Sequence, residues 1–142
     1  MIDDVKIKEL EHIASIIRGR IIETSCHTKT PHLGSCLSCV DILVALYFNE
    51  LNINPQQPND PLRDRFILSK GHGAPAIFQI LAERGYYPVS DLEKYGEDGS
   101  VFHEHPPAPK YLPGIEAATG SLGHGLPMGL GMALAAKIQK QD

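Results

Sequence analysis

The stretch that decides the fold reads Asp64-Arg65-Phe66-Ile67-Leu68-Ser69-Lys70-Gly71-His72-Gly73. Its middle is a short apolar run, and its end is a glycine-flanked turn that carries a lysine and a histidine. An apolar run that stops at such a turn is typical of a buried strand in a parallel sheet. We therefore predict a strand over residues 65–69, followed by a loop that presents His72.

Helical patterns lie on both sides of this predicted strand. Residues 5–24 carry apolar side chains at steps of three and four, the mark of an amphipathic helix. Residues 41–48 are apolar around most of their circumference, which indicates a buried helix. Further helices are expected over residues 74–84, over 91–95 after a capping-box spacing, and before residue 139. One strand among these helices predicts an incomplete α/β layer.

Turn-forming residues separate these elements. Residues 25–35 contain Pro31 and Gly34 and are expected to form a loop. Residues 51–63 are rich in Pro, Asn and Gln and predict a surface connection too short to separate domains. A chain of 142 residues predicts a single core, so residues 1–142 are expected to be one domain or a portion of one.

Composition narrows the classes of function. The formal net charge is −4 and no long basic run occurs, which argues against a nucleic-acid partner. Residues 1–6 contain Asp3 and Asp4 where a signal peptide needs a basic region followed by an apolar run, so a cytoplasmic location is expected. No apolar stretch approaches the roughly 20 residues that span a bilayer, so no membrane insertion is expected. The cysteines, Cys26, Cys36 and Cys39, are expected to be reduced packing residues.

Four polar segments interrupt the apolar elements. Three of them place His32, His72 and His105 in loops, and the fourth, residues 119–125, is a glycine-rich turn before a helix. Backbone groups of such a turn can approach a ligand closely. Each histidine taken alone is explained as a capping or hydrogen-bonded loop residue. Four such loops together favour a binding site for a small molecule.

Two other site classes fit the sequence poorly. His103, Glu104 and His105 offer metal ligands, but structural zinc sites combine two close pairs of ligands. The Cys36/Cys39 pair stands where a buried helix is expected to begin. A dinucleotide-binding fold is also disfavoured, because no G-x-G-x-x-G follows a strand at the expected place.

The order of the loops resembles the transketolase family, nearly from end to end. The motifs that carry the resemblance are His32-Leu33-Gly34, the residues 64–72 quoted above, His105-Pro106, Pro113-Gly114-Ile115-Glu116, and Thr119-Gly120-Ser121-Leu122-Gly123-His124-Gly125. The resemblance implies an α/β fold that is an incomplete thiamine diphosphate-binding domain, helix-rich with at least one buried parallel-type strand. The activity it implies is transfer of a two-carbon ketol unit between sugar phosphates.

The resemblance also implies roles for single residues. His72 is expected beside the diphosphate of the cofactor, where an N–H donor stabilises negative charge. His32 and His105 are expected to be the catalytic pair that contacts the oxygens of the ketose donor and assists proton movements. Gly120, Ser121 and Leu122 are expected to bind the cofactor at its aminopyrimidine side, and the cofactor supplies the carbanion chemistry.

Two departures from the family pattern bear on substrate detail. Pro31 stands where the family often has Gly, and His124 where it often has Gln. Pro31 stiffens the entry to its loop, and His124 retains a hydrogen-bond donor. Neither departure removes one of the implied roles.

The metal-binding part of the family pattern, Gly-Asp-Gly and a later Asn, is not found in these residues. The ligands of Mg²⁺ or Ca²⁺ are therefore expected outside this chain, which predicts no metal ligand within it. The chain alone is expected to be inactive and to act in a homo- or hetero-oligomer whose other chains supply the remaining domains. Two alternatives stay open, a non-catalytic remnant that serves as a binding or assembly module and a relative of deoxyxylulose-phosphate synthase.

Overall fold

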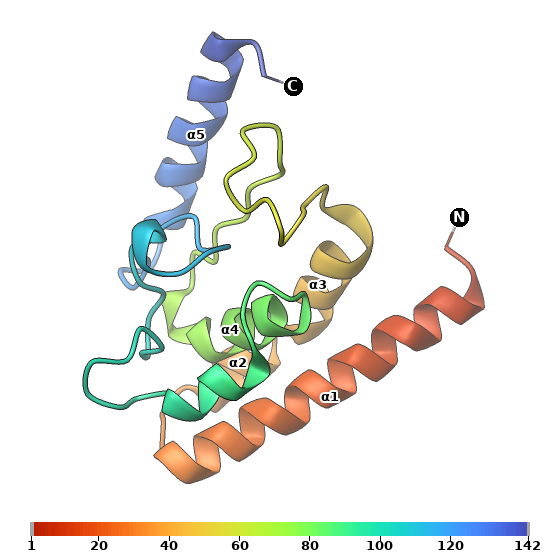
Figure 1. Cartoon of the computed structure of the whole chain (residues 1–142), viewed down its shortest axis with the longest axis vertical. Helices are drawn as coiled ribbons and strands as arrows, with labels where there is room; N and C mark the ends of the chain where they lie inside the picture. Colours follow the sequence, from red (N-terminus) through yellow and green to blue (C-terminus); the bar gives the residue numbers. More distant parts are fainter. Residues whose placement is uncertain (1, 142) are drawn as a thin grey trace.

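Helix α1 (Asp4–Thr28) forms one side of the molecule in the computed structural model, which describes residues 2–141 (Figure 1). The carboxylate of Asp3 accepts a hydrogen bond from the backbone N–H of Lys6 at 2.8 Å and so caps the helix. The helix ends at Lys29, which adopts the left-handed conformation with φ 53°. The prediction of a helix over residues 5–24 is confirmed, and the helix runs about one turn further than expected.

The buried core lies where α1 meets α3 (Val40–Ala45) and α4 (Ala74–Glu83) (Figure 1). Helix α4 is its centre, because every residue from 74 to 82 is buried. Helix α3 continues into a wider turn, η1 (Leu46–Glu50). The predicted helices over 41–48 and 74–84 are therefore confirmed. The largest fully buried side chains are Phe78, Ile17, Ile21, Leu43, Ile77, Ile80 and Leu81.

The predicted strand over residues 65–69 is wrong. Within the part of the chain that the structure describes no strand is present, and residues 65–69 form neither helix nor ladder. A strand needs a neighbouring backbone to which its N–H and C=O groups can bond. The apolar run is nevertheless inward-facing in part, since Leu68 is 8% exposed.

Two helix boundaries differ from the sequence expectation. A short helix, α2 (Leu33–Leu37), begins inside the predicted loop of residues 25–35, and α1 extends into the same loop as far as Thr28. The expected capping box does not form, because residues 89–94 make a 3₁₀ turn, η3 (Val89–Lys94), that starts after Pro88 without a side-chain cap. Two further 3₁₀ turns are η2 (Gly71–Gly73) and η4 (Pro109–Tyr111).

One apolar segment, Leu33–Glu50, is long and apolar enough to cross a membrane by length and composition. This corrects the expectation that no stretch approaches that length. Its buried residues include Val40, Leu43 and Val44, and α3 packs against both α1 and α4. A single segment of this kind is weak evidence for a span, since core helices pass the same test.

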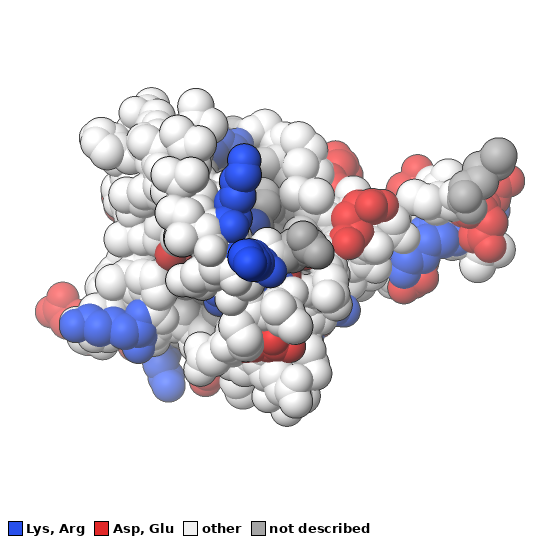
Figure 2. Space-filling view, turned by 90° about the horizontal axis from the view of Figure 1, so that it is seen from above, with Lys and Arg blue, Asp and Glu red and all other residues white. Residues whose placement is uncertain are grey.

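Helix α5 (Gly125–Gln139) projects from the rest of the molecule (Figure 1). The prediction of a final helix ending near residue 139 is confirmed. Only Gly125 is buried in it, although its sequence is largely apolar. Figure 2 looks down on this end, and the surface there is mostly uncharged. Its exposed apolar side chains are Leu126, Met128, Leu130, Leu134 and Ile138.

Candidate functional site

Three histidines from loops far apart in the sequence lie in one row. The ring of His72 is in the middle, with its centroid 4.7 Å from that of His32 and 4.5 Å from that of His105. Both outer rings stand edge-on to it, at interplanar angles of 79° and 76°. The structure thus brings together the two histidines predicted to be catalytic and the one predicted to contact the diphosphate.

His32 occupies a strained backbone position before α2. Its φ is 72°, in the left-handed region that non-glycine residues usually avoid. Such positions cost about 1–3 kcal/mol and cluster at functional sites. The preceding loop is tied back to α1, because the hydroxyl of Ser25 donates to the carbonyl oxygen of Thr30 at 3.0 Å. The exposed imidazole of His32 is therefore presented from a constrained loop.

Lys70 joins the loop of His72 to the helix that follows His32. Its ammonium group donates hydrogen bonds to the carbonyl oxygen of Ser35 and to Oγ of Ser38, the second at 2.9 Å. Sequence reasoning quoted Lys70 within its motif but assigned it no role. A cation two residues before the histidine was the available signal, and its partners are visible only in the folded chain.

Two buried thiols lie beside these loops. The thiol of Cys36 donates to the carbonyl oxygen of His72 at 3.8 Å. Burial, helped by the neighbouring Cys39, raises the pKa of the Cys36 thiol from 9.0 to about 11. Burial also raises the pKa of Cys39, although the ammonium of Lys70 opposes it. Cys26 is exposed, so the expectation that all the cysteines are packing residues is wrong for Cys26.

The backbone of residues 119–120 passes too close to the histidine loops to leave room for side chains. A Cβ on Gly71 would lie 2.2 Å from the carbonyl oxygen of Thr119, a distance at which neither group could stay. A Cβ on Gly120 would lie 3.1 Å from Cδ2 of His105. Thr119 is held in place because its Oγ1 donates to the carbonyl oxygen of Leu68 at 2.7 Å. Glycine is needed here because of close approach.

Ser121 and Leu122, the other residues predicted to bind the cofactor, face solvent. Leu122 is 72% exposed, so its side chain packs against little of the chain. The carbonyl oxygen of Ser121 accepts a hydrogen bond from the backbone N–H of His124 at 3.2 Å, which closes the turn before α5. The structure therefore places Gly120 beside the histidines and leaves the roles of Ser121 and Leu122 as predictions.

Potential metal ligands do not gather in the described chain. Among residues 2–141, no group of three or more His, Cys, Asp or Glu side chains is placed so that it could hold a metal ion. His103 and Glu104 are exposed loop residues.

Comparison with known proteins decides the family. The family described as "Transketolase, thiamine diphosphate binding domain" matches residues 10–142. The chain belongs to the transketolase family. Transketolases, which are α/β proteins, are also its structural neighbours: a transketolase from Pichia stipitis in complex with sedoheptulose 7-phosphate superposes with a TM-score of 0.83 at 33% identity. That superposition covers 89% of this chain and 18% of the other.

Curated relatives in the transketolase family include subunits of multi-chain enzymes. A subunit of the apulose-4-phosphate transketolase from Phocaeicola vulgatus is 40% identical over 138 residues, which are 97% of this chain and 48% of that protein. A subunit of the 6-deoxy-6-sulfo-D-fructose transketolase from a Clostridium species is 39% identical over 130 residues, 92% of this chain and 47% of that protein. The chain thus spans about half the length of these relatives.

The residues present fit the cofactor of the transketolase family. Nδ1 of His72 is buried and has no hydrogen-bond partner among the described residues. A buried polar atom of this kind costs about 1–3 kcal/mol unless something satisfies it. Gly120 places a backbone without a side chain directly beside the same row, where even an added Cβ would lie 3.1 Å from Cδ2 of His105. Both features suit a polar ligand bound against the row, as a thiamine diphosphate-binding domain requires.

Proposed function

We propose that this chain supplies the diphosphate-binding part of a transketolase site, in an enzyme that transfers a two-carbon ketol unit between sugar phosphates with thiamine diphosphate. The observation that carries the proposal is the row of His32, His72 and His105, which loops far apart in sequence bring into ring contact. The family match supports the proposal, because all three histidines lie within residues 10–142, which match the thiamine diphosphate-binding domain of transketolases.

Each residue of the site has a task in this proposal. His72 donates a hydrogen bond to the diphosphate and stabilises its charge. His32 and His105 flank it, contact the oxygens of the ketose donor and pass protons at their imidazole nitrogens. Gly120, Ser121 and Leu122 line the aminopyrimidine side. Thiamine diphosphate, when bound, supplies the electron sink that stabilises a carbanion.

The proposal includes a partner. Helix α5 exposes Leu126, Leu130, Leu134 and Ile138, and a groove of about 880 Å³ runs between α5 and residues 61–69. Apolar surface of this kind marks an interface when it is contiguous. We infer that other chains or domains of a cytoplasmic assembly cover it, supply the ligands of Mg²⁺ or Ca²⁺, and complete a site that is inactive in this chain alone. Relatives named as transketolase subunits support this inference.

Titration calorimetry with thiamine diphosphate and Mg²⁺ tests the proposal. The chain is titrated first alone and then with a candidate subunit that supplies the remaining half of the relatives' length. We expect binding only in the second case. Absence of binding in both cases would favour the alternative of a non-catalytic assembly module.

Two substitutions separate the roles within the completed enzyme. His72→Ala is expected to weaken cofactor binding, whereas His105→Ala is expected to lower turnover and keep cofactor affinity. His12→Ala is the matched control, because His12 is exposed on α1. Unchanged cofactor affinity in His72→Ala would remove the diphosphate role, and normal turnover in His105→Ala would remove the role at the donor sugar.

A further inference from the structure

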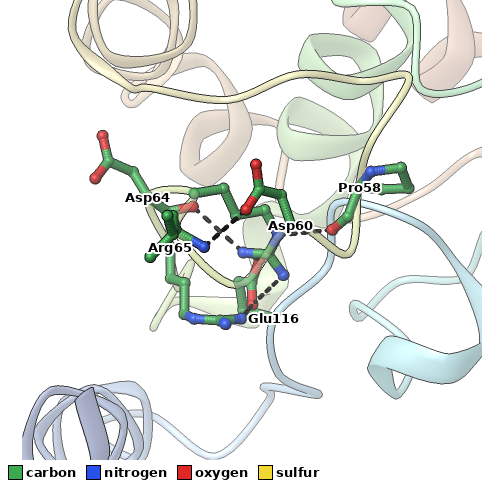
Figure 3. Close-up of polar contacts among 7 residues, drawn as sticks. Pro58, Asp60, Asp64, Arg65 and Glu116 are labelled. Carbon is green, nitrogen blue, oxygen red and sulfur yellow. Dashed lines mark hydrogen bonds and ion pairs between the residues drawn. The ribbon is translucent and has the colours of Figure 1, made fainter. Parts of the chain in front are cut away.

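A nearly buried carboxylate, Glu116, forms ion pairs with two arginines, Arg63 and Arg65 (Figure 3). Nη1 of Arg63 is 2.6 Å from Oε1 of Glu116, and Nη2 donates to Oε2 at 3.1 Å, so the pair is bidentate. Nη1 of Arg65 donates to Oε2 at 3.2 Å. Nε of Arg63 donates to the carbonyl oxygen of Pro58 at 2.6 Å. The cluster thus joins three stretches of chain.

The geometry of this cluster is fixed more firmly than that of a surface ion pair. The side chains of Arg63 and Glu116 are only 12% and 9% exposed, whereas Arg65 is 40% exposed. A bidentate pair of this kind defines both distance and orientation. Removing one partner leaves an unpaired charge in a poorly hydrated place, which is strongly unfavourable. Glu116 is therefore held at one position relative to Arg63.

A second contact joins the segment of Arg63 and Arg65 to the segment of Glu116, a few residues further along each. Arg65 and Glu116 are 51 residues apart, and Leu68 and Thr119, which the Thr119 hydroxyl joins, are also 51 apart. Glu116 pairs with residues 63 and 65, and Thr119, further along its segment, bonds residue 68, further along the other, so the two segments run side by side in the same direction. No backbone hydrogen bond between them is found in the described residues, so side chains set their register.

This register ends at the site. Gly120, directly after Thr119, lies against the ring of His105. A Cβ added to Gly120 would be 3.1 Å from Cδ2 of that ring. On the other segment, Gly71 abuts the Thr119 carbonyl just before His72. Any slip between the two segments would therefore move Gly120 relative to both histidines.

We propose that Glu116 is a positioning residue for the thiamine diphosphate site. Through Arg63 and Arg65 it sets the register of residues 116–122 against residues 63–72, and so sets where Gly120 stands opposite His72 and His105. Glu116 itself does not touch the row of histidines. The proposal rests on the proposed function for its effect on the cofactor, and on the structure alone for its effect on the imidazoles.

The test compares Glu116→Gln with Glu83→Gln in the assembled enzyme. Glu83 on α4 forms an ion pair with Arg20 on α1, and their side chains are 27% and 30% exposed, respectively. Glu83→Gln therefore controls for the loss of an ion pair away from the 63–72 and 116–122 segments. Two readouts are taken, the Kd for thiamine diphosphate and the NMR signals of ¹³C-labelled histidine rings without cofactor. Melting temperature is recorded for each variant.

For Glu116→Gln we expect the Kd for thiamine diphosphate to rise about tenfold, which corresponds to about 1.4 kcal/mol, and the ring signals of His72 and His105 to shift. Glu83→Gln is expected to change neither. A Kd within twofold of the parent with unmoved ring signals would overturn the proposal, as would the same changes in Glu83→Gln.

A second variant covers the case in which Glu116→Gln fails to fold. Arg65→Met removes the more exposed arginine and keeps the Arg63 pair, so a smaller rise in Kd and a smaller shift of the His105 signal are expected. Unmoved ring signals in Arg65→Met would then overturn the proposal. Failure of the parent enzyme to bind the cofactor would instead refute the proposed function, and the ring signals would still decide the role of Glu116.

Discussion

Helices α4 and α5 are both apolar along most of their length, yet they have opposite surroundings. Residues 74–82 of α4 are all buried, while in α5 only Gly125 is. Leu130 and Ile138 of α5 are 69% and 74% exposed, whereas Ile80 and Leu81 of α4 are fully buried. An apolar helix needs other parts of a protein to cover it, and the rest of this chain covers α4. It leaves α5 largely exposed.

Hydrogen exchange should show the largest difference between these helices. Amides of α4 are expected to exchange only through global unfolding, and those of α5 through local opening, so α4 should exchange at least about a thousandfold more slowly in the chain alone. Addition of the completing subunit should slow exchange in α5 and leave α4 unchanged. Equal protection of both helices in the isolated chain would contradict the comparison.

Truncation of one side chain in each helix should sharpen the contrast. Phe78→Ala removes a fully buried ring from α4 and should lower the free energy of unfolding by about 3–5 kcal/mol through the cavity it leaves. Leu130→Ala on α5 should change it by less than about 0.5 kcal/mol. Urea unfolding of the two variants measures both values. A large loss in Leu130→Ala would mean that α5 is already packed in solution.

Alkaline pH should weaken the packed part of the chain. Burial raises the pKa of Cys36 from 9.0 to about 11, so the unfolded chain releases this proton first as the pH rises. The contribution of the protonated Cys36 thiol to the free energy of unfolding is therefore complete below pH 9. It falls by about 2 kcal/mol as the pH rises from 9 to 11. Buried Tyr95, whose pKa burial raises to about 12, acts in the same direction at higher pH. A Cys36→Ala variant with an unchanged pH profile would contradict the assignment.

Glycine substitutions test the comparison at the smallest scale. Gly19 on α1 and Gly131 on α5 both have open space where a Cβ would be added. Ala in a helix interior is favoured by roughly 0.5–1 kcal/mol over Gly. Gly19→Ala should raise the melting temperature because α1 packs on the core, whereas Gly131→Ala should raise only the helix content of α5. Circular dichroism during thermal unfolding measures both effects.

The sequence predicted the helices better than their surroundings. Periodic apolar residues located α1, α3, α4 and α5, because a helix is a local structure that the pattern of a few turns specifies. The strand over 65–69 was predicted wrongly, since a strand exists only through hydrogen bonds to another segment. The prediction of a capped helix over residues 91–95 was also wrong, because residues 89–94 form a 3₁₀ turn without a side-chain cap.

The candidate site divides in the same way. The motifs identified His32, His72 and His105 as belonging to one site, and the structure places their rings together. Motif reasoning did not find the links between loops made by Lys70, or the clamp of Glu116 by two arginines. Such links join residues more than 30 positions apart, and nothing in a local pattern pairs them.

The sequence by itself determined where the helices run, which loops carry histidine and which family the motifs resemble, because all of these depend on neighbours along the chain. Only the tertiary structure decided that α4 is covered and α5 is not, that His32 takes a left-handed backbone, and that Glu116 pairs with Arg63 and Arg65. These features depend on contacts between distant residues, and such contacts exist only after the chain has folded.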